Sequence, residues 1–487
     1  MGIRVKGLGS WWMVVPLLSV ASLAAPSGDL RLVEAVRKGD RDAVRSLIRE
    51  AADVNAAQPD GATALAWAAH SNDLETAELL IRAGADVNAA NDYGVTPLSL
   101  ACTNGSAAMV NKLLTAKANP NAALSAGETV LMTCARAGDV AAVKALLAHG
   151  ADVNVKETRS GQTALMWAVA EKHPQVARAL IERGGDVHAR SKGGFTPLLL
   201  AARHGDLDSA RILLDAGANV NESTPEEGSA LVVASGSGHE ALAIFLLERG
   251  ADPNVADRSG TTALHYAMLK AITPYQDITG GLAYLSYMFR PNMVELVKVL
   301  LQHGANPNAR LAKTPRLPNG KSGMIGLAGA TPFCLAAAVG DVGVMRVLHE
   351  KGADSLLATE EKVTPLMAAA GLGRRVNGHM DRTAEEEKSA LEAVKLAVEL
   401  GADVHASTET GLTALHGAAY TGANTIIQFL VDKGAQVDVQ DKFGQTPLSI
   451  AQKNMPPGLP NKFRSDQAYD KTVLLLRELS GEIPVGR

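Results

Sequence analysis

The sequence contains few aromatic residues and few cysteines. Aromatic residues make up 4% of the 487 residues and there are three cysteines, so neither a disulfide framework nor a cysteine-bound zinc site is expected. Lysine and arginine (47) do not outnumber aspartate and glutamate (51), which argues against a nucleic-acid-binding protein. Hydrophobic residues nevertheless make up 47%, so the chain is expected to fold, with alanine and leucine supplying most of the core.

Long hydrophobic runs are also missing, apart from a short one near the N-terminus. Residues 11–24 are mostly apolar, follow Arg4 and Lys6, and end before a polar stretch. A run of about fourteen residues is too short to cross a membrane, which takes about twenty. Positive charge, a short apolar run and small residues are together typical of a secretory signal peptide. We therefore predict a signal peptide over residues 1–24, cleaved after Ala24.

The predicted destination is the periplasm or the outside of the cell, with no membrane span after cleavage. Cleavage after Ala21 is the second choice, and a buried N-terminal helix or an uncleaved anchor is the alternative interpretation. The loss of Arg4 and Lys6 would make a chain of net charge −4 more acidic still.

A period of 33 residues runs through the remainder of the chain, and such a period is the mark of a repeat protein. Each repeat is marked by the same three-residue pattern. The first residue is threonine or serine, the second is alanine, proline or valine, and the third is leucine or phenylalanine. The markers are Thr63, Thr96, Thr129, Thr163, Thr196, Ser229, Thr262, Thr331, Thr364, Thr413 and Thr446. A second signature, Gly-Ala-Asp-Val-Asn or a variant of it, follows most of them, as at residues 84–88 and 150–154. Counting back from Thr63 adds a first unit and gives twelve units over residues 28–481.

Each unit has the local signals of two short helices and an extended turn. The threonine is typical of a helix N-cap, and a proline after it, as in Thr96-Pro97, suits the first helical position. Alanine pairs such as Ala201-Ala202 allow neighbouring units to approach closely. The glycine of the second signature suits the left-handed C-cap of the second helix. Where Ala51 and Lys117 replace it, we expect helix ends that are slightly strained or differently capped.

This pattern closely resembles the ankyrin repeat, and the resemblance covers nearly all of the predicted mature chain. It implies an all-α repeat solenoid of about twelve stacked helix–turn–helix units with extended, hairpin-like turns. His265 and His416 occupy the position where the family usually has histidine, whereas Lys362 takes a glycine position before its threonine. The resemblance also implies a non-enzymatic module that binds other proteins.

No motif in the sequence indicates catalysis. Phosphate-binding loops, nucleophile elbows and His-Glu-x-x-His pairs are missing, and the twelve histidines are spread along the chain, so we predict no catalytic, cofactor or metal site. The three cysteines, Cys102, Cys134 and Cys334, are interpreted as free and buried, because Cys102 and Cys134 fall at different positions of adjacent first helices. Three large aromatics at one repeat position are interpreted as core packing: Trp67, Trp167 and Tyr266.

Partner binding is instead expected where the side chains vary between units. In the ankyrin family these positions are the tips of the extended turns and the exposed ends of the first helices, which line a concave groove. Tyrosine, phenylalanine and arginine there are the residue types that dominate interface energies. The candidates are Tyr93, Arg136, Arg159, Phe195, Arg203 and His204, with Asp92, Asn104, Glu171, Arg258, Tyr420 and Phe443 as further exposed positions.

Three insertions interrupt the period, near residues 271–291, 309–328 and 373–388. Long insertions in compact repeats are usually functional or disordered. The first is rich in tyrosine and the second is basic without any acidic residue. The binding candidates in them are Tyr275, Tyr284, Tyr287, Arg310, Lys313, Arg316 and Lys321.

The sequence thus predicts an exported, monomeric protein-binding scaffold that is not an enzyme and uses the groove, the insertions of the eighth to tenth units, or both. The partner is expected to be a protein, not a nucleic acid. Two other functions remain open: an enzyme with its site in the insertions, and a structural or protective subunit of an envelope complex.

Overall fold

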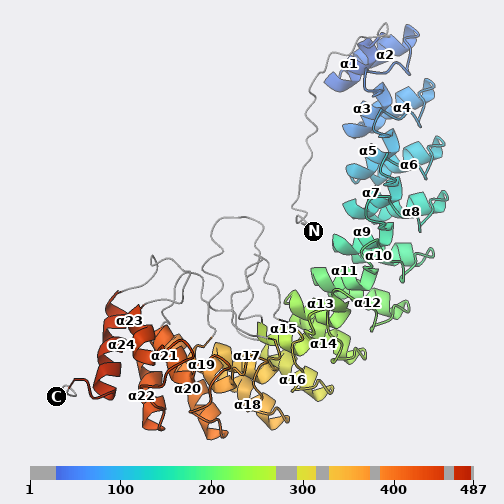
Figure 1. The fold of residues 1–487 in the computed structure, drawn as a ribbon. Helices are drawn as coiled ribbons and strands as arrows, with labels where there is room; N and C mark the ends of the chain where they lie inside the picture. Colours follow the sequence, from blue (N-terminus) through green and yellow to red (C-terminus); the bar gives the residue numbers. More distant parts are fainter. Residues whose placement is uncertain (1–28, 270–292, 314–327, 373–383, 454–465, 484–487) are drawn as a thin grey trace. The chain divides into compact units, whose positions relative to one another are not determined.

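The computed structural model describes residues 29–269, 293–313, 328–372, 384–453 and 466–483. These residues form two compact units, an N-terminal one that ends at Glu222 and a C-terminal one that begins at Ser223. Each unit is a stack of helix pairs (Figure 1). Below, a repeat means one helix pair together with the extended turn that precedes it.

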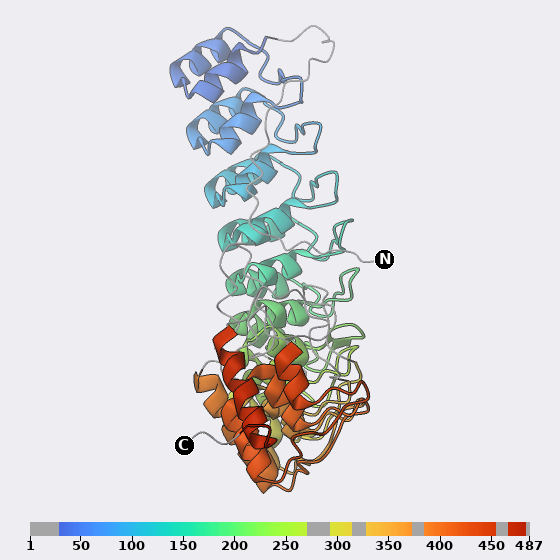
Figure 2. The same ribbon diagram turned by 60° about the vertical axis from the view of Figure 1, so that its left-hand side comes forward.

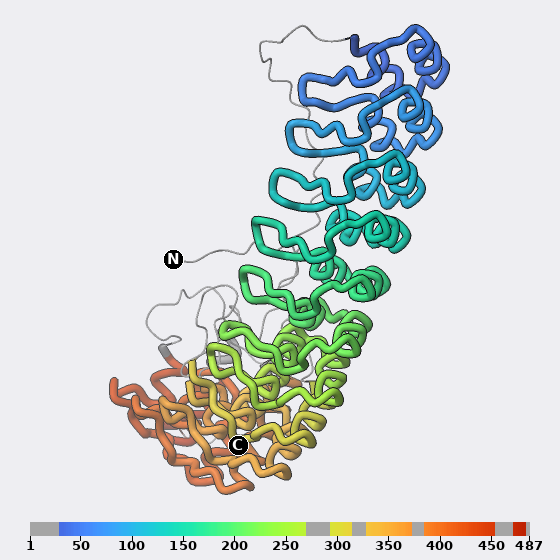
Figure 3. The backbone as a smooth tube through the Cα atoms, turned by 90° about the vertical axis from the view of Figure 1, so that its right-hand side faces the viewer, coloured from blue at the N-terminus to red at the C-terminus, as the bar shows by residue number. Residues whose placement is uncertain are grey.

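The N-terminal unit contains six helix pairs. Their first helices are α1 (Arg31–Lys38), α3 (Ala64–His70), α5 (Pro97–Thr103), α7 (Val130–Ala137), α9 (Ala164–Ala170) and α11 (Pro197–His204). Their second helices are α2 (Arg41–Arg49), α4 (Leu74–Arg82), α6 (Ala107–Thr115), α8 (Val140–Ala148), α10 (Pro174–Ile181) and α12 (Leu207–Asp215). First helices stack on first helices and second on second, and all the extended turns of this unit project on the same side of the helices (Figures 2 and 3).

The C-terminal unit continues the same pattern, and its first turn is a short antiparallel pair in which Ser223 lies opposite Ser229. Its strands are β1 (Ser223–Thr224) and β2 (Gly228–Ser229). Its first helices are α13 (Ala230–Gly236), α15 (Ala263–Leu269), α17 (Pro332–Val339), α19 (Pro365–Ala370), α21 (Ala414–Thr421) and α23 (Pro447–Lys453). Its second helices are α14 (Glu240–Glu248), α16 (Val294–Gln302), α18 (Val342–Glu350), α20 (Ala384–Glu399), α22 (Asn424–Asp432) and α24 (Asp466–Leu479).

Most of the predicted helix caps are present, whereas Ser229 makes no side-chain cap hydrogen bond to α13. The Thr163 hydroxyl accepts the Met166 N–H at 3.3 Å, and equivalent bonds cap α3, α5, α7, α11, α17 and α19. Ala51 and Lys117 adopt φ of 58° and 72°, the left-handed conformation that normally requires glycine. Of the two alternatives expected for these helix ends, the structure has the strained one.

The histidines of α15 and α21 complete two of the caps. His265 Nδ1 accepts the Thr262 N–H at 3.2 Å, and the other ring nitrogen, Nε2, lies 3.1 Å from the Ala309 carbonyl oxygen. His416 makes the same two contacts, with Thr413 and with the Gln445 carbonyl. Since Nδ1 accepts, Nε2 carries the proton and donates it, so both rings are neutral in this arrangement.

The expectation that all three cysteines are free was wrong. Cys102 and Cys134 form a disulfide that joins α5 to α7, with their Cα atoms 4.5 Å apart. The two cysteine positions differ by one residue relative to their threonines, and α5 and α7 pack directly on each other. The sixth residue after Thr96 therefore meets the fifth after Thr129. Cys334 is free and buried as predicted, and burial raises the pKa of its thiol to about 12.

A ladder of asparagine side chains connects successive second helices. In the N-terminal unit, Asn121 donates to the Gly150 carbonyl at 3.1 Å and accepts the Asp152 N–H at 2.8 Å. Asn55, Asn88 and Asn154 make the same pair of bonds to the next repeat. His188 occupies the fifth position and instead pairs through Nδ1 with Glu222 at 2.9 Å.

Replacing Asn121 by alanine should lower the free energy of unfolding by about 1–2 kcal/mol, because two hydrogen bonds between repeats are lost. Asn111→Ala is the matched control, since Asn111 bonds only within its own helix, to Ala107 at 2.9 Å. Urea denaturation of both variants measures the difference. Equal stability of the two variants would show that the ladder contributes nothing.

Candidate protein-binding surface

Six large or basic side chains of the N-terminal unit lie where the tips of the turns meet the ends of the first helices. We call them the aromatic–arginine surface: Tyr93, Arg136, Arg159, Trp167, Phe195 and Arg203. Backbone hydrogen bonds hold neighbouring turn tips together, from Thr158 N–H to the Ala126 carbonyl at 3.0 Å and from Lys192 N–H to the Ser160 carbonyl at 2.7 Å. The surface is therefore carried by a regular, hydrogen-bonded row of turns.

Tyr93 stands at the tip of the third turn and is 65% exposed. The Asn91 side chain closes this turn by accepting the N–H groups of Tyr93 and Val95 at 3.0 and 2.9 Å. Gly94 has a φ of 78°, and a Cβ there would lie 3.2 Å from the Ala123 carbonyl oxygen of the next turn. Tyr93 is thus an exposed aromatic side chain on a rigid support.

Arg136, at the end of α7, lies over the indole ring of Trp167 in the next repeat. The guanidinium carbon is 4.8 Å from the ring centroid, and an amino nitrogen is 3.4 Å from the Glu128 carboxylate. A guanidinium stacked on a ring uses its planar face and keeps its N–H groups at the edges. The Arg136 carbonyl oxygen is also 3.0 Å from His173 Nε2, which anchors the end of α7.

The indole nitrogen of Trp167 is buried and has no hydrogen-bond partner among the described residues. The corresponding groups elsewhere are satisfied by their own turns: Trp67 Nε1 donates to Gln58 at 2.9 Å and the Tyr266 hydroxyl to Asp257 at 2.7 Å. The fifth turn has one extra residue, and its acidic side chain, Glu157, bonds elsewhere. Trp167 is therefore a hydrogen-bond donor that its own repeat does not satisfy.

The Glu157 carboxylate caps its own turn instead. It accepts N–H bonds from Ser160 at 2.8 Å and from Gln162 at 3.0 Å, and also from Arg159. Burial opposes ionisation of this carboxyl group, but the hydrogen bonds outweigh burial, so the pKa of Glu157 lies below its usual value. These bonds fix the turn that presents the exposed Arg159 side chain.

The sixth repeat brings together two of the predicted residues. The Arg203 guanidinium, at the end of α11, lies 4.0 Å from the centroid of the Phe195 ring on the preceding turn. Phe195 and His204 are half-buried, and Arg203 is exposed. The two arginine–aromatic pairs therefore recur two repeats apart on the same surface.

The sequence interpretation of Trp67, Trp167 and Tyr266 as core residues was wrong. All three are half-buried, because the fourth position after the threonine lies beneath the turn, at the edge of the stack. The Trp67 ring meets His70 edge-on at 5.7 Å between centroids. The sequence signal that could have identified this edge is a charged or aromatic residue seven positions after the threonine, as at His70 and Arg136.

The predicted residues of the C-terminal unit do not form a comparable cluster among the described residues. Arg258 pairs with Glu226 at 2.8 Å, Tyr420 is half-buried, and Phe443 is 76% exposed. Arg310 and Lys313 are exposed. Tyr275, Tyr284, Tyr287, Arg316 and Lys321 lie outside the described residues, so the insertion hypothesis stays a prediction.

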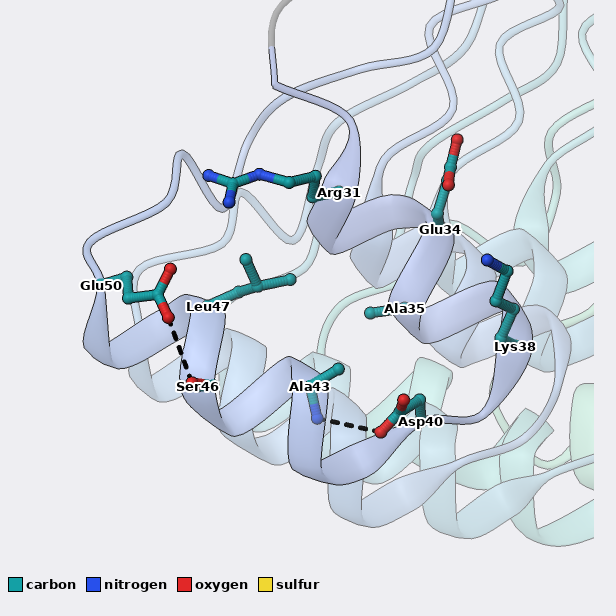
Figure 4. Close-up of a pocket in the computed structure, with 9 residues that line it drawn as sticks. All are labelled: Arg31, Glu34, Ala35, Lys38, Asp40, Ala43, Ser46, Leu47 and Glu50. Carbon is teal, nitrogen blue, oxygen red and sulfur yellow. Dashed lines mark hydrogen bonds between the residues drawn. The ribbon is translucent and has the colours of Figure 1, made fainter.

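A hollow of about 380 Å³ lies between α1 and α2, at the exposed end of the first helix pair (Figure 4). Asp40 caps α2 by accepting the Ala43 N–H at 2.9 Å, and Ser46 donates to Glu50 at 3.2 Å. Charged side chains surround the hollow: Arg31, Glu34, Lys38, Asp40 and Glu50. A polar outer face of this kind is what a terminal repeat needs for solubility.

Within the described ranges, no group of three or more histidine, cysteine or acidic side chains is arranged to hold a metal ion. Over the same ranges, no helix has the length and hydrophobicity needed to cross a membrane.

The fold and the surface define a helical-repeat solenoid. A model of three ankyrin repeats matches residues 32–123, 110–191, 131–224, 198–279 and 382–459, and a single-repeat model matches residues 259–311. These matches cover more than half of the chain, which belongs to the ankyrin repeat family. Ankyrin repeats are protein–protein interaction modules and are generally non-enzymatic.

Similar proteins share only part of their length with this chain. A transient receptor potential cation channel subfamily A member 1 homolog of Caenorhabditis elegans is 29% identical over 126 residues, which are 26% of this chain and 9% of that protein. Protein phosphatase 1 regulatory subunit 27 of Mus musculus is 42% identical over 60 residues, 12% of this chain and 39% of that protein. The solved human ASB11 ankyrin repeat domain is 28% identical with a TM-score of 0.41, covering 47% of this chain and all of that domain.

Proposed function

We propose that the protein is an exported, monomeric scaffold that binds a partner protein through the aromatic–arginine surface, the insertions of the eighth to tenth units, or both. The observation that carries the proposal is the pairing of Arg136 with Trp167 and of Arg203 with Phe195 on a rigid row of turns. Arginine, tryptophan and tyrosine are enriched among the residues that dominate binding energy at interfaces.

Two observations support export. Residues 1–24 have the layout of a signal peptide. The Cys102–Cys134 disulfide is fully buried within the stack, and structural disulfides persist in oxidising compartments such as the periplasm and the cell exterior.

The mature protein is expected to begin at Ala25. Expression of the full-length chain in a secreting host, followed by intact-mass measurement of the exported fraction, checks the cleavage site. The cytosolic fraction of the same cells is the control. A full-length chain found only in the cytosol would contradict export.

Affinity capture from the envelope fraction, read by mass spectrometry, decides which surface binds. Tyr93→Ala, Phe195→Ala and Arg203→Ala together should abolish capture if the aromatic–arginine surface is the site. Deletion of residues 273–289, or Arg310→Glu with Arg316→Glu and Lys321→Glu, should abolish it if the insertions are the site. Capture that survives both sets of changes would refute the proposal.

A further inference from the structure

We propose that the fourth to sixth repeats bind an extended, acidic segment of the partner protein, with a carboxylate at about every third residue. This inference rests on the proposed function and adds the chemistry of the ligand. Four observations carry it: the local charge, the two stacked arginines, the unsatisfied indole nitrogen of Trp167, and the spacing of the repeats.

The exposed charge on these three repeats is mainly positive. Arg136, Arg159, Lys192 and Arg203 lie at the turn tips and first-helix ends of the fourth to sixth repeats, where Glu171 is the exposed acidic residue. The half-buried Glu128 is already the ion-pair partner of Arg136. The chain as a whole is acidic, with a net charge of −4. Because the protein as a whole is negatively charged, an anionic partner is attracted to this cationic area and not to the rest of the surface.

The arginine geometry suits carboxylates. Stacking on Trp167 and Phe195 restrains both guanidinium groups, and the planar N–H edges of a guanidinium match a carboxylate. The contact between Arg136 and Glu128, at 3.4 Å, is longer than a normal N–H···O hydrogen bond of about 2.7–3.2 Å. A ligand carboxylate can therefore bind Arg136 without breaking a strong bond.

The indole nitrogen of Trp167 adds a donor in the middle of the surface. It has no acceptor among the described residues, and Arg136 lies over the face of the same ring. Because an indole N–H points outward in the plane of the ring, a backbone carbonyl of the ligand would accept it at the ring edge, beside the guanidinium that covers the face. An extended segment supplies both acceptors, a carboxylate and a carbonyl, within one or two residues.

Repeat spacing sets the expected spacing of the acidic residues. Adjacent packed helices lie about 8–10 Å apart, and an extended chain advances about 3.3 Å per residue. A segment that crosses the first helices thus advances one repeat in about three residues. Arg136 and Arg203, at the ends of α7 and α11 two repeats apart, would then meet carboxylates about six residues apart, and Arg159, on the turn of the repeat between them, would meet one near the midpoint.

The favoured occupant is a peptide rather than a nucleic acid. The basic side chains of the proposed site span only three repeats, and the net negative charge of the chain would repel a long polyanion. A single-stranded oligothymidylate therefore serves as the competing probe in the test.

The test is selection of a random-peptide phage library on the mature protein, followed by fluorescence anisotropy with the selected peptides. Enriched peptides should carry aspartate or glutamate at about every third residue and bind more weakly in high salt. Arg136→Glu, Arg159→Glu and Arg203→Glu together should weaken binding by about tenfold or more. The milder triple glutamine variant should weaken it in the same direction, and thermal melting of both variants checks their folding.

The matched control reverses the same amount of charge on the second helices of the same three repeats: Lys144→Glu, Arg178→Glu and Arg211→Glu. It should leave binding within about twofold of the wild type, because these exposed side chains lie on α8, α10 and α12 and not on the turn tips or first-helix ends that form the proposed site.

The outcomes separate the two proposals. Enriched peptides without an acidic excess, or equal losses in the control and test variants, overturn this inference and leave the proposed function standing. Tighter binding of oligothymidylate than of any selected peptide overturns it in favour of a nucleic acid. A library that yields no binder, together with an envelope fraction that yields none, overturns both.

Discussion

Reducing the disulfide between Cys102 and Cys134 should lower the free energy of unfolding of the N-terminal unit by about 3–4 kcal/mol. The bond closes a loop with a sequence separation of 32 residues, and closing a loop of that size restricts the unfolded chain by about this amount in the chain-entropy model. It also joins two repeats whose first helices pack directly on each other. Its loss should therefore weaken one interface within a stack whose stability is a sum of repeat and neighbour terms.

The measurement is urea denaturation of the oxidised protein with and without a reducing agent. The variant Cys102→Ala with Cys134→Ala should unfold at the same concentration in both conditions and close to the reduced wild type. Cys334→Ala is the matched control, because it removes the free, buried cysteine and keeps the disulfide. It should retain the full difference between oxidised and reduced protein.

Thiol counting and hydrogen exchange localise the effect. The denatured, unreduced protein should show one reactive thiol, that of Cys334, and reduction should release those of Cys102 and Cys134. Protection of backbone amides should fall most in α5 to α8. A reduced protein as stable as the oxidised one would mean that the unfolded state is already restricted without the bond.

The helices and their caps were predictable because their causes are local. The hydroxyl of Thr163, the rigid ring of Pro197 and the left-handed glycine at Gly205 each act within a few residues of their own position. Because the sequence repeats every 33 residues, the same local signals recur in each unit, and the structure inferred for one unit applies to the others. The two exceptions to the glycine rule fit the same pattern, because Ala51 and Lys117 adopt the left-handed backbone conformation that glycine normally adopts there.

The disulfide and the edge position of Trp167 were not predictable from the period. The disulfide depends on the contact between α5 and α7, and the surroundings of Trp167 depend on its own turn and on Arg136 of the preceding repeat. Arg136, seven residues after its threonine, lies over Trp167, four residues after the next. The candidate surface was therefore predictable as a set of exposed turn tips, whereas its arginine–aromatic pairs were not.

The single insertion in the fifth turn shows how a small change in sequence alters the chemistry of a repeat. Trp67 and Tyr266 donate to Gln58 and Asp257 of their own turns, and Asp257 accepts turn N–H groups through its other oxygen. In the longer fifth turn, both oxygens of Glu157 accept N–H groups of the turn itself. This leaves Trp167 Nε1 without an acceptor in the described structure. The repeat with one extra residue in its turn therefore carries an aromatic N–H, that of Trp167, without an acceptor among the described residues.

Acidification from about pH 6.5 to pH 4 should destabilise the C-terminal unit by up to about 3 kcal/mol through His265 alone. Burial lowers the pKa of His265 from 6.5 to about 4, and one pKa unit corresponds to about 1.4 kcal/mol. Between these values the unfolded chain binds a proton that the folded chain does not. Unfolding therefore takes up a proton, and stability falls as the pH falls.

The hydrogen bonds explain why the folded state excludes the proton. His265 Nδ1 accepts the Thr262 N–H, so a proton on Nδ1 would face that donor. The carbonyls of Ala309 and Ala330 and the charge of Asp257 favour the protonated ring but do not offset its burial. Burial also lowers the pKa of His416, which adds to the effect with the same sign.

His265→Asn separates the titration from the cap, because its amide oxygen can accept the Thr262 N–H but cannot be protonated in this range. The variant should be less stable than the wild type near neutral pH and should lose less stability on acidification. His303→Asn is the matched control, since it makes the same substitution at an exposed histidine of the same unit. Urea denaturation across this pH range measures all three proteins. Parallel pH profiles for the wild type and His265→Asn would show that other groups, not the buried histidine, set the acid sensitivity.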